Sequence, residues 1–188
     1  MRIVEIKGEK VSKEYDYISS LDSDGLRIAR LGNKKFLINE KGEKVSKEYY
    51  WMSSLDSDGL RVVRLSSRYF LINEKGEKVS KEYDYICSLD SDGLRRVILN
   101  GRYFLINEKG EKVSKEYYWM SSLDSDGLRI VRLDRDGLRR VILNSRYFLI
   151  NEKDEKVSKE YCWMSSLDSD GLRIARLDDE KFKNKSEW

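Results

Sequence analysis

The chain has 188 residues, 39% of them hydrophobic, which is enough for one domain with a modest core. Charged residues make up 38%, yet the net charge is only +3, because acidic and basic side chains alternate locally, as in EKGEKVSKE. This mixed surface argues against a nucleic-acid partner, and no apolar run approaches the roughly 18 residues of a membrane helix. The start, MRIVEIKGEK, lacks a signal-peptide pattern, so the cytoplasm is the default expectation. A fragment of a larger exported protein would look the same.

The absence of histidine removes several kinds of chemistry. Ser/His and Cys/His nucleophiles, imidazole proton transfer and most zinc sites all need that side chain. Cys87 and Cys162 occupy different places in the repeat described below, so we expect two free thiols rather than a disulfide. We expect no cofactor and no enzymatic activity.

An internal repeat organises the whole chain. The phrase INEKGEKVSKEY begins at Ile38, Ile72 and Ile106, and it recurs at Ile150 with Asp154 in place of glycine. Successive copies are 34 residues apart until the last, which is delayed by an insert at residues 134–143. This period predicts one repeat domain of five modules. Their boundaries are 1–33, 34–67, 68–101, 102–145 and 146–188, and the last module closes with the polar segment DDEKFKNKSEW.

The elements expected within a module are β-strands. In the third module, RYFLIN predicts a strand, and EKG predicts a hairpin turn with its glycine in the left-handed region. EKVSKEY alternates like a half-exposed strand, with Val79, Lys81 and Tyr83 on one face. YDYICSL predicts a more buried strand, LDSDG predicts a turn, and LRRVIL predicts another strand.

These elements predict an all-β fold, a solenoid-like array of antiparallel hairpin or meander modules. A β-helix would place equivalent arginines and aspartates about 4.8 Å apart in like-charged ladders, which argues against one strand per module. A small β-propeller-like arrangement is the alternative. The apolar strip of one module is expected to comprise Val45, Tyr49, Leu55, Leu60, Val63, Leu65, Leu71 and Ile72.

The insert, DRDGLRRVIL, copies the end of the third module and is expected to add one strand. An added strand reverses the chain direction. We therefore predict a local irregularity at residues 128–146, with the fifth module packed differently from the others.

Large aromatic residues occupy one equivalent position in every module: Tyr17, Trp51, Tyr85, Trp119 and Trp163. The first interpretation is that they pack against the next module. The alternative is a platform for ligands, such as a glycan or cell-wall material, which requires the rings to be exposed.

The paired aspartates of LDSDG are weak candidates for a repeated cation site: Asp22, Asp24, Asp56, Asp58, Asp90 and Asp92. The EF-hand pattern fails, because Ser20 stands at the first ligand position and Leu31 where glutamate is required. Aspartate before glycine in a turn needs no metal. A pair repeated in every module is also a poor catalytic site, and salt bridges from the neighbouring arginines are the preferred interpretation.

The modules resemble the bacterial WG-containing (KWG-type) β repeats over nearly the whole chain. The residues that carry the resemblance are Tyr69, Leu71, Ile72, Asn73, Gly76, Tyr83, Asp84, Gly93 and Leu94. Phe70, Phe104 and Phe148 replace the glycine of the family's Trp-Gly pair, and VSKE replaces its proline-bearing segment. The resemblance implies an all-β, non-catalytic repeat protein and supplies no catalytic residues.

Repetition creates a long surface with the same side chains at regular intervals, which suits avid binding of a protein or polymer. We therefore expect an interaction scaffold with a protein partner whose identity the sequence does not give. Binding of a glycan or another small ligand on the repeated aromatic positions is the alternative.

Overall fold

The computed structural model describes residues 15–133, 146–151, 153–170 and 172–177, together with the backbone of two short strands before them. All the regular elements described are β-strands, which confirms the all-β repeat array. They are β1 (Glu5–Ile6), β2 (Glu9–Lys10), β3 (Tyr17–Ile18), β4 (Arg27–Leu31), β5 (Lys34–Ile38), β6 (Trp51–Met52), β7 (Arg61–Leu65), β8 (Arg68–Ile72), β9 (Tyr85–Leu89), β10 (Arg95–Leu99), β11 (Arg102–Ile106), β12 (Trp119–Met120), β13 (Arg129–Leu133), β14 (Arg146–Ile150), β15 (Trp163–Met164) and β16 (Ala175–Arg176).

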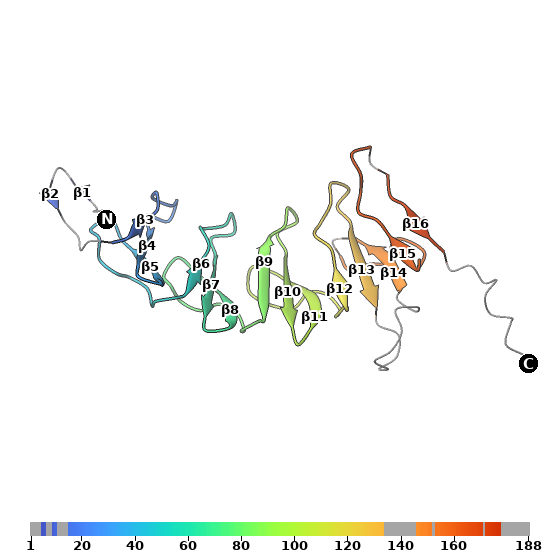
Figure 1. Ribbon diagram of the computed structural model, residues 1–188, viewed down its shortest axis with the longest axis horizontal. Helices are drawn as coiled ribbons and strands as arrows, with labels where there is room; N and C mark the ends of the chain where they lie inside the picture. Colours follow the sequence, from blue (N-terminus) through green and yellow to red (C-terminus); the bar gives the residue numbers. More distant parts are fainter. Residues whose placement is uncertain are drawn as a thin grey trace, which may run out of the picture.

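The strands form small antiparallel sheets that follow one another along the long axis (Figure 1). Four sheets have three strands each, in the orders β3-β4-β5, β6-β7-β8, β9-β10-β11 and β12-β13-β14, and β15 pairs with β16. The array is open, with β3 near one end and β16 near the other (Figure 1). No helix in the described part of the chain could span a membrane.

Short side chains and glycines fix the turns of each module. Gly76 in the EKG turn has a φ of +73° and Gly93 in the LDSDG turn has a φ of +77°, as the sequence predicts for left-handed positions. Asn73 accepts a hydrogen bond on Oδ1 from the amide of Glu77, which closes the EKG turn. Ser80 Oγ accepts a hydrogen bond from the amide of Leu71. The segment INEKGEKVSKEY therefore recurs because its asparagine, glycine and serine form the same turn and the same hydrogen bonds in each module that contains it.

The segment EKVSKEY was expected to be a regular strand, and this prediction is wrong. It touches the preceding strand only at isolated bridges, such as Ile72 with Lys78 and Tyr69 with Tyr83. Between these bridges Ser80 Oγ takes a backbone amide as a ladder carbonyl would, and its hydroxyl donates to the carbonyl of Lys81. A side chain therefore replaces part of the ladder and bends the chain toward the next sheet.

The core lies between successive sheets rather than along one strip. Val62 and Leu71, on one face of the β6-β7-β8 sheet, pack with Ile86, Val97 and Phe104 of the following sheet. Neighbouring residues of the same strands point to the opposite face. That face, which includes Val63, Phe70 and Ile72, packs with Ile28 and Leu37 of the preceding sheet. The β6-β7-β8 sheet, inside the array, is thus covered on both faces by its neighbours.

This arrangement corrects two of the predicted core residues. Tyr49, Leu60, Val63, Leu71 and Ile72 are buried as predicted, and Leu55 is half-buried. Val45 and Leu65, however, are exposed. Val45 lies in the segment that forms no regular strand, and Leu65 is the last residue of β7 beside the hairpin tip, so alternation does not determine their burial.

The insert does not disturb the strands that flank it. β13 pairs with β14 from Arg129 opposite Ile150 to Leu133 opposite Arg146. The equivalent strands β7 and β8 pair in the same register, from Arg61 opposite Ile72. The predicted irregularity is therefore wrong for residues 129–133 and 146. The predicted extra strand at residues 134–143 lies outside the described residues.

Candidate binding surface

An arginine and two aspartates join successive modules in what we call an arginine clamp. Arg61, at the start of β7, donates from Nη1 to Asp24 Oδ2 (2.5 Å) and from Nη2 to Asp22 Oδ2 (2.7 Å) in the preceding LDSDG turn. The same contacts form the clamps Arg95–Asp56–Asp58 and Arg129–Asp90–Asp92. The three arginines are fully buried. The salt bridges expected between the arginine strand and the aspartate turn are present, and they connect different modules.

Charge pairing in the clamp outweighs the cost of burial. Burial alone would raise the pKa of Asp24, but the hydrogen bond and positive charge of Arg61 lower it below its usual range. The pKa of Asp92 is lowered in the same way, against burial, by Arg129. Burial also opposes the charge of Arg61, yet Asp24 and Asp22 raise its pKa. In Asp24, Asp92 and Arg61 the charged form is therefore favoured despite burial.

Acid should weaken the array through these carboxylates. Because the pKa of Asp24 and Asp92 is lower in the folded state, their contribution is complete above the unfolded value of about 3.9 and is lost as pH falls through the folded value. We expect a melting temperature that falls below about pH 4 and still falls in about 1 M salt, where exposed pairs are screened within about 3 Å. Thermal melts followed by circular dichroism at several pH values measure this effect. The Asp24→Asn variant, which lacks one of the titrating carboxylates, is compared with the wild type. Loss of the acid effect in high salt would contradict a buried origin.

The six aspartates that were weak candidates for a cation site are the ones that bind arginine in the clamps. In all three turns the carboxylates face a buried guanidinium of the next module. In the described part of the chain, no three acidic or thiol groups gather as metal ligands do. The two cysteines are free thiols, as predicted, and burial raises the pKa of Cys87.

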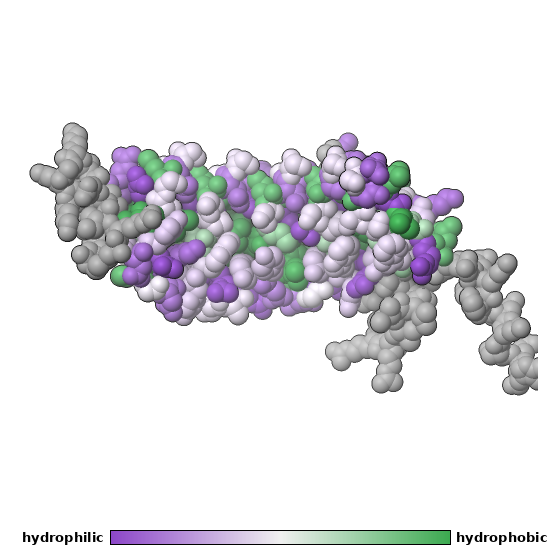
Figure 2. Space-filling model, turned by 45° about the horizontal axis from the view of Figure 1, so that its top comes forward, coloured by the Kyte–Doolittle hydropathy of each residue, from purple (hydrophilic) through white to green (hydrophobic). Residues whose placement is uncertain are grey.

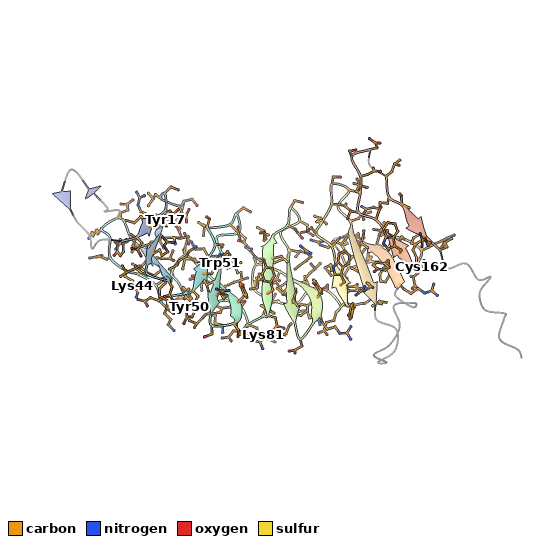
Figure 3. The ribbon with its side chains drawn as sticks, viewed as in Figure 1. Tyr17, Lys44, Tyr50, Trp51, Lys81 and Cys162 are labelled. Carbon is orange, nitrogen blue, oxygen red and sulfur yellow. The ribbon has the colours of Figure 1, made fainter. Side chains whose placement is uncertain are left out.

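The aromatic residues at the equivalent position of each module form what we call the aromatic row. It comprises Tyr17, Trp51, Tyr85, Trp119 and Trp163, and each is the first residue of the first strand of its sheet. They are between 36% and 46% exposed. The rings are therefore partly in solvent, and two of them, Trp51 and Tyr85, also pack edge to face on Tyr69. Figure 3 places Tyr17 and Trp51 on successive sheets along the array.

A cationic side chain lies opposite the aromatic row in four of the five sheets that carry it. Trp51 lies opposite Arg64, which lies opposite Tyr69. The Trp51 and Tyr69 rings meet edge to face with centroids 6.4 Å apart, and Tyr69 meets Tyr85 of the next sheet at 5.2 Å. Aromatic rings and cations thus alternate on one surface, and Tyr69 links two modules. Figure 2 shows hydrophobic and hydrophilic residues interleaved along the array.

The third module interrupts this pattern. Ile98 takes the place of Arg64 in the cross-strand row, and Arg96 takes the place of the buried Val62. Arg96 donates to the carbonyl of Met120 (2.9 Å) and to Ser122 Oγ (2.9 Å) in the next module. The row is therefore less cationic at its centre, while the contact to the next module is more polar.

Sequence reasoning found the aromatic row and the aspartates but missed two kinds of residue. It did not predict the flanking residues, which are Arg64, Tyr69, Tyr103, Arg132 and Tyr147. It also missed the burial of the clamp arginines. The signal for the clamps was available, because LDSDGLR recurs unchanged in all five modules, whereas a surface salt bridge tolerates variation.

A family comparison supports the resemblance found in the sequence. Residues 69–103 match the WG containing repeat. This stretch runs from β8 into β11 and covers one full period of the array. The chain thus contains a WG-type β repeat. No curated protein sequence matches it.

Two solved structures are similar to the chain at low levels. KlHsv2 with loop 6CD replaced by a Gly-Ser linker is 12% identical with a TM-score of 0.42, over 77% of this chain and 52% of that one. A protein of unknown function from Bacteroides caccae is 15% identical with a TM-score of 0.33, over 81% and 61%. The chain spans less than two thirds of either structure. Neither similarity carries an argument about function.

Proposed function

We propose that this WG-repeat chain is a non-catalytic scaffold that binds an extended segment of a partner protein along its aromatic row. The observation that carries the proposal is the exposure of five large aromatic side chains at equivalent positions in successive modules. Tryptophan, tyrosine and arginine are the residues that contribute most to binding energy at protein interfaces. The row combines all three.

The spacing of the row adds to the argument. Each site alone offers one ring and one flanking cation, which would bind weakly. A partner that touches several modules gains effective concentration for each further contact, so modest sites combine into a strong one. Arg30, Arg64, Arg132 and Arg176 lie opposite aromatic residues of the row and favour a segment that carries carboxylates.

Glycan binding is the second candidate. The exposed faces of Trp51, Trp119 and Trp163 favour it, because indoles stack on the apolar faces of sugar rings. A glycan would depend chiefly on these indoles, whereas an acidic protein segment would depend on the arginines as well.

Selection from a displayed library of random peptides tests the proposal. We expect enriched peptides, rich in acidic residues, that bind the triple variant Trp51→Ala/Trp119→Ala/Trp163→Ala at least roughly 30-fold more weakly, equivalent to about 2 kcal/mol. The matched control is Val45→Ala/Val113→Ala/Val157→Ala, which removes exposed apolar groups from the repeated polar phrase. If the peptides bound both triple variants equally, the aromatic row would be excluded as their binding site. Binding of cell-wall oligosaccharides instead of peptides, lost in the tryptophan variant, would favour the second candidate.

A further inference from the structure

The last described sheet leaves uncovered a face that every earlier module covers. Leu172 is 65% exposed and Ile174 is 69% exposed. The equivalent residues of the second module, Leu60 and Val62, are 7% and 3% exposed because the following sheet packs on them. Figure 2 shows strongly hydrophobic surface at this end of the described array. The end therefore presents an apolar face whose usual cover is another module of the same kind.

The same end carries an LDSDG turn without its arginine. Asp168 Oδ1 accepts hydrogen bonds from the amides of Asp170 and Leu172, so the turn itself has its usual form. In the turns before it, an arginine of the next module binds the aspartates. Within the described residues, no cation reaches Asp168 or Asp170. This turn is half of an arginine clamp.

The other half lies at the opposite end of the array. Arg27 is equivalent to Arg61, but its Nη1 donates only to the carbonyl of Ser19 (3.2 Å). Arg27 is also partly exposed, in contrast to the fully buried Arg61.

We propose that copies of this chain associate head to tail, with Arg27 of one copy completing the clamp of Asp168 and Asp170 in the next. Leu172 and Ile174 then lie against the first module of the second copy. The contact repeats the one that joins modules within the chain, so its geometry is already present three times in each molecule.

Charge selects this orientation over the alternative. Two C-terminal faces brought together would place two unpaired aspartate pairs side by side, and like charges at an interface are unfavourable. Joining opposite ends pairs them with arginine. Such a contact does not close on itself, so the expected products are linear oligomers that grow with concentration.

Analytical ultracentrifugation of three chains tests the proposal. The wild-type chain should associate increasingly as its concentration rises. Arg27→Gln and the double variant Asp168→Asn/Asp170→Asn should each stay monomeric when alone. Mixed together, the two variants should form a one-to-one dimer and nothing larger, because each retains the end that the other lacks. Glu74→Gln, an exposed neutralisation far from both ends, is the control and should behave as wild type.

Each outcome decides the matter. A wild-type chain that stays monomeric at all concentrations would overturn the proposal. So would association that persists in the double variant, because another surface would then be responsible. Circular dichroism melts of the variants establish that each is folded. Failure of the mixture to form dimers, with both variants folded, would show that Arg27 and the aspartates do not meet.

Discussion

Replacing Arg95 with methionine is expected to lower the free energy of unfolding by about 3–5 kcal/mol. Methionine keeps much of the volume of the side chain but leaves Asp56 and Asp58 without the guanidinium that binds both. Arg95 is 1% exposed, whereas Asp56 and Asp58 are 29% and 11% exposed, so water can replace the lost hydrogen bonds only in part. Urea denaturation of the full chain, followed by circular dichroism, measures the change.

The matched control is Arg68→Met. Arg68 pairs with Asp84 on the surface, where both side chains are substantially exposed. Exposed pairs contribute about 0–1 kcal/mol, so this variant should unfold nearly as wild type does. If the two variants lost the same stability, the clamp would be no stronger than an ordinary surface pair. Adding Asp56→Asn and Asp58→Asn to Arg95→Met should recover part of the loss, because the uncompensated charges are then removed.

Gly110→Ala is the second substitution with a large expected effect, about 2–5 kcal/mol of unfolding free energy. Gly110 has a φ of +72°, where an L-residue costs about 1–2 kcal/mol. A Cβ there would also lie 2.8 Å from Ser80 Cβ and 3.0 Å from Val79 O of the preceding module. Relieving such an overpacked contact costs about 1–3 kcal/mol.

Gly59→Ala separates these two causes. Gly59 has a similar φ of +76°, but a Cβ there would meet nothing within 4 Å. It should lose only the conformational part, about 1–2 kcal/mol by urea denaturation. Equal losses in the two variants would show that the modules can move apart at Gly110 without cost.

Asp154 shows how the fifth module meets the same requirement. It replaces the glycine of the turn and holds a φ of 61°. Its carboxylate accepts hydrogen bonds from Tyr117 Oη (2.6 Å) and from the amide of Lys115 (2.9 Å). In the earlier modules the tyrosine hydroxyl reaches a glycine carbonyl instead, as Tyr83 does at Gly110. Aspartate tolerates the left-handed region better than most residues, and here it gains two partners.

Local rules predicted the parts of the fold that depend on neighbours in sequence. RYFLIN and LRVVRL became β8 and β7 because aromatic and β-branched residues favour strands, and the glycine turns took the positive φ that hairpins require. EKVSKEY failed because Ser80 replaces a ladder hydrogen bond, which alternation cannot indicate. In the second module the Ser53 hydroxyl accepts an amide hydrogen bond, and β6 ends at Met52. In the third module Cys87 stands at the position of Ser53, and the equivalent strand β9 continues to Leu89.

Contacts between modules could not be predicted from local rules, because they join residues that are far apart in the sequence. Trp51 was expected to pack against the next module; it does contact Tyr69, yet its position at the start of a two-residue strand leaves it partly in solvent. Arg61 was expected to form a salt bridge with an aspartate turn, but its burial was not predicted. It is buried because two aspartates 37 and 39 residues earlier in the chain neutralise it. Burial at both positions depends on how one module lies on the next.

The arginine clamp has a consequence for how such a gene can change. The clamp arginine of each module binds the preceding module, and its aspartate pair binds the following one. When a module is duplicated or deleted, each remaining junction therefore still pairs one arginine with two aspartates. Unequal crossing-over between nearly identical copies therefore yields arrays of different lengths that all satisfy their buried charges. The additional residues lie in sequence between β13 and β14, and these two strands keep the register of the other modules. Array length is thus free to drift or to be selected, while the sequence of each junction is held nearly constant.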